Sequence, residues 1–237
     1  MVPFKKIRAS AAERKGGEDV LASLLPPKPH NEALRNLPDS RVLSTMAQRV
    51  FSAGFVWRVI EEKWPGFEEA FLNFEPRALL FQPDDFWHDL ASDKRIVRNP
   101  QKIMSVRENT AFVDRIAKEH GSFGNFLAGW PADDQIGLMN VLAKQGSRLG
   151  GNTGQYVLRW LGWDTFVLSR DMVAALRDAG LDIAENPTSK KDLAKIQVQM
   201  NAWVNETGLP RAHLSRILAM SIGPNAPAEE LVRYTGD

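Results

Sequence analysis

Three glycines within five residues constrain the fold of the second half of the chain. Gly150, Gly151 and Gly154 stand directly before an apolar run, residues 156–161, that has helical spacing. Glycine adopts backbone conformations that other residues avoid, so this cluster predicts a tight turn that opens a helix. The free N–H groups of a first helical turn attract anions, phosphate among them. The stretch therefore predicts a helical hairpin with an anion site, and a carboxylate, Asp171, follows one helix later.

Helical spacing of apolar residues recurs along the chain, and no run alternates between polar and apolar residues. Residues 41–63 predict one long helix, and residues 101–119 predict another. The fold class that follows is all-α. Residues 1–39 are polar and proline-rich, which favours a loosely ordered arm. We expect the helical domain to occupy residues 40–223, and residues 224–237 to form a tail.

The composition excludes several kinds of site. The chain has 237 residues, no cysteine and four histidines that lie far apart, so we expect no disulfide, no thiolate nucleophile and no metal site. The formal net charge is only +1, so a nucleic-acid surface would need its positive charge gathered on one face. No apolar stretch reaches membrane-spanning length and no secretory signal is present, which favours a cytoplasmic protein.

A basic segment surrounds the helix-breaking pair Asn99-Pro100. Its five positive charges fall within fourteen residues: Lys94, Arg95, Arg98, Lys102 and Arg107. One interpretation is phosphate contact by Arg98, Asn99 and Lys102, together with the free N–H groups that open the following helix. The other interpretation is a solvated helix face.

Three motifs occur in order in the first half: AGFVW at 53–57, FLNFEP at 71–76 and RIVRNPQKI at 95–103. Together they resemble the signature of the 3-methyladenine DNA glycosylase I family over about residues 40–130. The glycine hairpin followed by Asp171 is similar to the wider helix–hairpin–helix DNA glycosylase superfamily. The resemblance implies an all-α, glycosylase-like bundle with a cleft between two helical subdomains.

The resemblance and the chemistry of base excision together suggest roles for individual residues. Asp171 takes the catalytic position, with Asp164 as the second candidate. Each of these two carboxylates could instead cap a helix, which for Asp171 would be the helix over residues 172–179. Tyr156 and Trp160 are secondary candidates for stacking on a base. The base-pocket residues are Trp57, Phe55, Arg49 and Trp163. The residues expected at the DNA backbone are Gly151, Asn152, Thr153, Gly154, Arg98, Asn99 and Lys102.

Two departures from the family pattern stand out. The family binds zinc through cysteine and histidine, and because this chain lacks cysteine we expect no zinc and no other cofactor. The family also has a glutamate in its base pocket, four residues before the Ala-Gly pair, where this chain has Arg49.

The resulting expectation is a monofunctional DNA N-glycosylase of base-excision repair. It would bind double-stranded DNA that contains a damaged, 3-methyladenine-like base, flip that base out and hydrolyse its N-glycosidic bond. Asp171 would stabilise the sugar cation or position water. Gln155, not lysine, follows Gly154, so strand cleavage through a Schiff base is not expected. We expect a monomer, associated with the nucleoid when it is bound to DNA. The alternatives are a catalytically inactive DNA-binding protein with the glycosylase fold and a helical protein-interaction domain.

Overall fold

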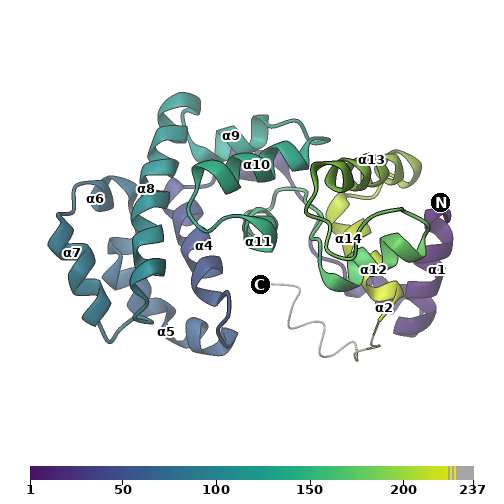
Figure 1. Ribbon diagram of the computed structural model, residues 1–237, viewed down its shortest axis with the longest axis horizontal. Coiled ribbons are helices and arrows are strands. Elements are labelled where there is room, and N and C mark those ends of the chain that lie inside the picture. The colour runs from purple at the N-terminus through teal and green to yellow at the C-terminus, as the bar shows by residue number, and fades with distance from the viewer. Residues whose placement is uncertain (224, 226, 228–237) are drawn as a thin grey trace. The chain divides into compact units, whose positions relative to one another are not determined.

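The computed structural model describes residues 1–223, 225 and 227, and over these residues it contains helices and no strand (Figure 1). The all-α expectation is therefore confirmed. The chain divides into two compact units. The first, here called the terminal unit, comprises residues 1–29, 131–136 and 164–237, and the second, the central unit, comprises residues 30–130 and 137–163. Each unit is described by itself below.

The central unit holds all three of the sequence motifs. One long helix, α8, runs beside α4 (Figure 1), and the apolar stripes of both helices belong to one buried cluster that includes Met46, Val50, Ile103 and Val106. Each such side chain stabilises the fold by roughly 1.5–3 kcal/mol when it is fully buried. Its helices are α3 (Asn31–Arg35), α4 (Asp39–Ser52), α5 (Trp57–Ala70), η1 (Leu72–Phe74), α6 (Pro76–Leu80), α7 (Asp84–Asp89), η2 (Leu90–Ser92), α8 (Pro100–His120), α9 (Phe123–Gly129), the greater part of α10 (Gln135–Gln145), and α11 (Gly151–Leu161).

The single helix predicted over residues 41–63 is wrong, because α4 ends at Ser52 and α5 begins at Trp57. Gly54 has φ +77°, a left-handed conformation that ends a helix and favours glycine. Lys102 on α8 reinforces the break, since its Nζ donates to the carbonyl oxygen of Phe51 at 3.0 Å and to that of Ala53 at 2.6 Å. The break makes Trp57 the first residue of α5.

The terminal unit joins the two ends of the sequence. In Figure 1 the purple helix α1 lies with the green and yellow helices α12 and α14, and α1 and α14 are in extensive contact. The helices of this unit are α1 (Phe4–Lys15), α2 (Glu18–Ser23), α12 (Arg170–Asp178), α13 (Lys190–Thr207) and α14 (Arg211–Ser221).

The loosely ordered arm expected over residues 1–39 is a further difference. Phe4, Ile7 and Ala11 recur at helical spacing on α1 and are buried in the core of the terminal unit, as are Leu21 and Leu24. The partners of this apolar stripe come from the opposite end of the sequence, so local composition did not indicate that it would be covered.

The expected tail, residues 224–237, falls almost entirely outside the described residues. Among the helices that the structure describes, none combines the length and the hydropathy needed to cross a membrane.

Candidate functional site

The three glycines lie at the start of α11, with Gly150 as its N-cap and Gly151 and Gly154 in its first turn, and close packing holds them there. A Cβ atom added to Gly154 would lie 2.2 Å from the carbonyl oxygen of Leu149, so no larger residue fits there. Gly151 has φ +57°. The buried side chain of Asn109 accepts a hydrogen bond from the N–H of Ser147 at 2.7 Å and donates to its carbonyl at 3.1 Å. These contacts confirm a tight turn that opens a helix.

The start of α11 borders a small open cavity in the central unit. Gly150 is the N-cap, no side chain caps the helix, and its first turn has no acidic residue. The N–H groups of that turn therefore remain available to an anion. The residues that line the cavity are Val50, Ala53, Lys102, Arg148, Gly150 and Thr153.

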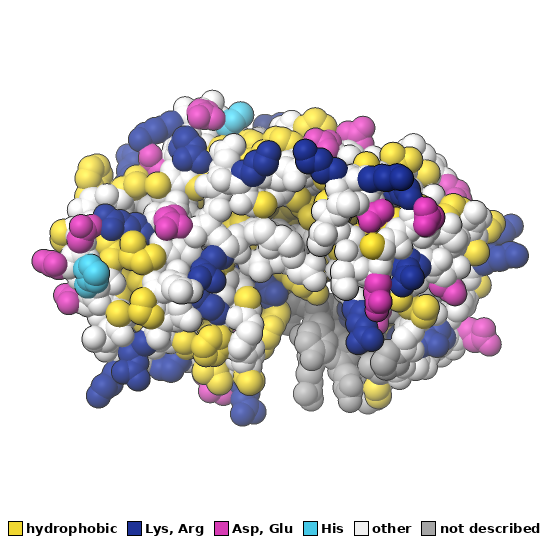
Figure 2. Space-filling view, viewed as in Figure 1, with side chains coloured by type: hydrophobic (Ala, Val, Ile, Leu, Met, Phe, Trp, Pro, Cys, Tyr) yellow, Lys and Arg dark blue, Asp and Glu magenta, His cyan; other side chains and the backbone are white. Residues whose placement is uncertain are grey.

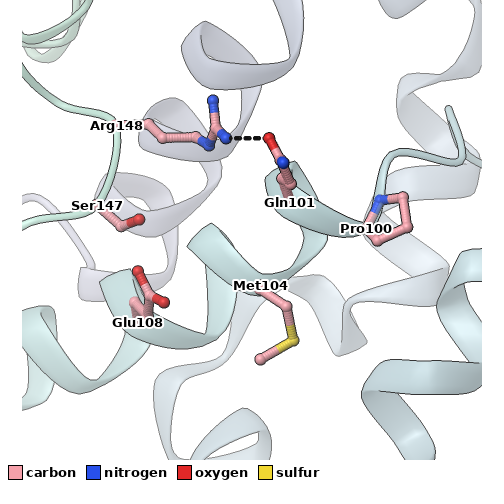
Figure 3. A pocket seen from close by; sticks show the side chains of 6 residues that line it. All are labelled: Pro100, Gln101, Met104, Glu108, Ser147 and Arg148. Atoms are coloured by element: carbon pink, nitrogen blue, oxygen red, sulfur yellow. Dashed lines mark hydrogen bonds between the residues drawn. The ribbon is translucent and has the colours of Figure 1, made fainter.

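Two positive charges lie at this cavity, those of Lys102 and Arg148. Burial, and then the nearby charge of Arg148, lower the pKa of Lys102. Arg148 is exposed, has φ +58° and donates to the side-chain oxygen of Gln101 at 2.6 Å (Figure 3). The neighbouring pocket drawn in Figure 3 also exposes Ser147 and Glu108 beside Arg148. The combination of two cations with a helix N-terminus suits a phosphate.

The basic segment around Asn99 has structural roles that its sequence did not indicate. The Asn99 side chain accepts from the backbone N–H of Lys102 at 3.1 Å and so caps α8. Lys102 is 7% exposed and its ammonium donates to two carbonyls at the end of α4. Arg98 is exposed. Arg148 was missed by sequence reasoning, although a basic residue within a glycine turn is a usable signal.

Arg49 on α4 lies in a cage of three aromatic rings. Its guanidinium carbon is 4.5 Å from the ring centroid of Trp57 and 4.6 Å from those of Tyr156 and Trp160. Arg49 is 8% exposed, and its Nε and Nη1 atoms are buried without a hydrogen-bond acceptor among the described residues. Burial lowers the pKa of Arg49. The structure thus brings together two of the expected base-pocket residues, Arg49 and Trp57.

The other two expected pocket residues are not among the rings that surround Arg49. Trp163 is 3% exposed in the core of the central unit, and its Nε1 donates to the carbonyl of Leu127 at 3.2 Å. The prediction of a base-stacking role for Trp163 is therefore wrong, because packing and a hydrogen bond occupy its ring on all sides. Phe55 is exposed, and the ammonium of Lys102 lies 4.6 Å from its ring centroid.

Asp171 lies in the first turn of α12, in the terminal unit, where the helix dipole favours a carboxylate. The alternative that Asp171 caps this helix is wrong, because Ser169 is the N-cap and accepts from the N–H of Met172 at 3.2 Å. Among the described residues the Asp171 carboxylate, which is half-buried, makes no hydrogen bond or ion pair.

Gly223 packs directly on that carboxylate. A Cβ atom added to Gly223 would lie 3.0 Å from Oδ1 of Asp171, and Gly223 has φ +76°. Arg14 on α1 donates to the carbonyl oxygens of Met220, at 3.2 Å, and of Gly223, at 2.5 Å. The N-terminal helix therefore holds the backbone segment against which Asp171 is positioned.

Asp164, the second catalytic candidate, is used elsewhere in the fold. Its Oδ2 accepts from the backbone N–H of Arg211 and its Oδ1 from that of Ala212, both at 3.0 Å. Both carboxylate oxygens thus cap α14, a helix distant in sequence. The expectation that Asp164 caps a helix is confirmed, and the helix that it caps is α14.

No group of three or more histidine, cysteine, aspartate or glutamate side chains that could hold a metal ion occurs within the part of the chain that the structure describes. The expectation that metal and cofactor are absent stays a prediction.

One segment of the chain matches a known protein family. Residues 35–145 match the family model of the methyladenine glycosylases. A solved 3-methyladenine DNA glycosylase I in complex with 3-methyladenine is 20% identical and aligns over 60% of this chain and 84% of its own, with a TM-score of 0.49. For the enzyme of that name from Staphylococcus aureus the identity is 22%, the coverages are 59% and 81%, and the TM-score is 0.48.

A third similar structure is the 8-oxoguanine glycosylase/lyase of Methanocaldococcus jannaschii in complex with DNA that contains 8-oxoguanine. It is 12% identical, covers 90% of this chain and 95% of its own, and has a TM-score of 0.49. The match to the family model confirms the resemblance drawn from the three motifs. It ends before the glycine turn and before Asp171.

Proposed function

We propose that this chain, whose residues 35–145 carry the sequence pattern of the methyladenine glycosylase family, is a DNA N-glycosylase that removes a damaged base from double-stranded DNA. The match over that segment is the observation that carries the reaction class. It supports a DNA glycosylase more firmly than it supports any one substrate. A 3-methyladenine-like base is the first substrate to test, because the matched family bears that name.

The start of α11 would hold the DNA backbone. Its open N–H groups and the cations of Lys102 and Arg148 border one cavity, which supports phosphate binding there. Over the face seen in Figure 2, lysine and arginine side chains are scattered among acidic and apolar ones. Phosphate binding therefore depends on positive charge close to the start of α11. Flipping a base costs a few kcal/mol, and a firmly held backbone offsets that cost.

Asp171 would act on the flipped nucleotide. Breaking the N-glycosidic bond leaves positive charge on the sugar, and a nearby carboxylate stabilises that charge or positions the attacking water. Among the described residues no hydrogen bond or ion pair engages the Asp171 carboxylate, which supports such a role. Since Gln155 follows Gly154, the proposal is a monofunctional enzyme that leaves the DNA strand intact.

The test is base release from duplexes that carry alkylated, deaminated and oxidised bases. The wild type should release a base, and Asp171→Asn should slow release by roughly 100-fold or more, which is the effect typical of losing one electrostatic contact to a transition state. Asp178→Asn is the matched control, because Asp178 is exposed at the other end of the same helix. Borohydride should trap no covalent adduct with DNA.

Three results would count against parts of this proposal. Equal release by the wild type and Asp171→Asn would remove Asp171 from the mechanism. Tight, salt-dependent DNA binding without release of any base would favour the catalytically inactive DNA-binding protein. Weak binding with a flat response to salt would contradict both DNA-based functions and favour a protein-interaction domain.

A further inference from the structure

Arg49 is a buried cation, and its Nε and Nη1 atoms have no hydrogen-bond acceptor among the described residues. The aromatic cage of Trp57, Tyr156 and Trp160 satisfies its charge through their ring faces, but rings accept no conventional hydrogen bond from Nε or Nη1. Burying donors without acceptors costs free energy that a ligand with a suitable acceptor would recover. The cage therefore lacks a hydrogen-bond acceptor for Arg49, and a bound ligand could supply one.

The aromatic cage is already occupied by a cation, the guanidinium of Arg49. Trp57 and Trp160 pack edge to face, with centroids 5.3 Å apart and planes at 73°, and the guanidinium lies against both rings and against Tyr156. A second cation stacked here would meet a fixed positive charge a few ångströms away in a poorly solvated site, where like charges repel strongly. A neutral ring would not meet that repulsion.

Of the three rings of the cage, Trp57 is the most exposed. Trp57 is 36% exposed and begins α5, directly after the Gly54 break, whereas Tyr156 and Trp160 are half-buried on α11. The most exposed ring of the cage thus belongs to a residue of the AGFVW motif that was expected in the base pocket.

Resting on the proposed glycosylase function, we propose that Arg49 makes this site select neutral bases that present a hydrogen-bond acceptor, such as a carbonyl oxygen, and reject bases that alkylation has made cationic. The guanidinium donates to the acceptor edge of the base, while Trp57 stacks on its face. Burial also lowers the pKa of Arg49, a sign of how poorly the cage is solvated.

The first experiment compares base release by the wild type, Arg49→Glu, Arg49→Gln and Arg49→Lys. Cationic substrates are 3-methyladenine and 7-methylguanine in methylated DNA, and neutral ones are hypoxanthine, uracil and 8-oxoguanine. The wild type should favour the neutral set. Arg49→Glu should shift the ratio of release rates toward the cationic set by roughly tenfold or more, because it reverses the charge beside the base. Arg49→Lys, which keeps the charge, should still reject the cationic set.

The second experiment needs no catalysis. Calorimetry measures the binding of guanosine, which is neutral, and of 7-methylguanosine below neutral pH, where it is cationic. The wild type should bind guanosine more tightly, and Arg49→Gln should lose the preference. Thermal melting of each variant checks folding, and Arg49→Gln stands in if Arg49→Glu does not fold.

The two proposals fail in different ways. If the ratio of cationic to neutral base release is at least as high for the wild type as for Arg49→Glu or Arg49→Gln, the role of Arg49 is overturned while the glycosylase function stands. If no base is released but the preference for guanosine depends on Arg49, the selectivity stands and the glycosylase function fails. If the wild type and Arg49→Gln show the same preference between the two nucleosides, and no base is released, both the selectivity and the glycosylase function fail.

Discussion

Asp164 binds Arg211 through both the main chain and the side chain: its Oδ2 accepts from the backbone N–H at 3.0 Å and lies 3.4 Å from Nη1 of the guanidinium. With the N–H of Ala212 on Oδ1, this carboxylate supplies the cap that Pro210, the N-cap residue of α14, lacks. Asp164 therefore stabilises the terminal unit.

Asp164→Ala should lower the free energy of unfolding by about 1–3 kcal/mol, because it removes a helix cap and leaves a buried arginine without its carboxylate. Chemical denaturation measures this. Asp178→Ala, at an exposed position, is the control and should change stability little. If Asp164→Ala is as stable as the wild type but loses base release, Asp164 is a catalytic residue after all.

Gly154→Ala should destabilise the hairpin, because its Cβ would overlap the carbonyl oxygen of Leu149 at 2.2 Å. Forcing that backbone apart should cost roughly 1–3 kcal/mol and weaken DNA binding. Gly129→Ala is the matched control, since a Cβ there meets nothing within 4 Å and the residue ends a helix. Melting curves and a DNA titration distinguish the two variants. Equal behaviour of both would mean that the turn relaxes freely.

Arg148→Asn should reduce the salt dependence of DNA binding. Asparagine tolerates the left-handed backbone at this position, φ +58°, while removing the charge beside the start of α11. Loss of one phosphate contact should make the slope of log affinity on log salt less negative by about 1. Arg35→Asn on α3, where Arg35 pairs with Glu32, serves as the control. An unchanged slope for Arg148→Asn would exclude a phosphate contact by this residue.

Asp39 should make stability depend on acidity. Burial raises the pKa of Asp39 above 3.8, although its Oδ1 accepts from the N–H of Phe123 at 2.8 Å. In the window between 3.8 and the raised pKa the folded state binds more protons than the unfolded state. The contribution of this group to stability is therefore full below 3.8 and is lost as the pH rises through the raised pKa.

Asp39→Asn keeps the acceptor and removes the charge. At neutral pH this variant should be at least as stable as the wild type, and its advantage should shrink as the pH falls through the window. Asp39→Ala leaves the Phe123 N–H without its acceptor and should cost about 1–3 kcal/mol. Urea unfolding of the three proteins over a pH series measures both effects. An advantage of Asp39→Asn that grows on acidification would contradict the sign.

Local patterns in the sequence predicted much of the fold. Apolar residues at helical spacing predicted α8 to within one residue at each end, and the glycines at 150–154 predicted the turn with which α11 begins. Three motifs predicted the family segment. These features succeed because helix periodicity, proline and glycine act through neighbours that are close in sequence.

Local sequence patterns could not predict contacts between segments that are distant in the chain. The apolar stripe of α1 finds its cover on α14, and the carboxylate of Asp164 caps a helix that begins 47 residues later. The tertiary structure also buried Trp163, which the sequence had placed in the base pocket.

By itself the sequence determined the all-α class, the glycine hairpin, the missing cysteines and the replacement of the family glutamate by Arg49. Only the tertiary structure decided what surrounds Arg49, because its environment is assembled from α4, α5 and α11. The aromatic rings that surround Arg49, and the lack of acceptors near its Nε and Nη1 among the described residues, result from packing between segments about a hundred residues apart. No local sequence pattern encodes such packing.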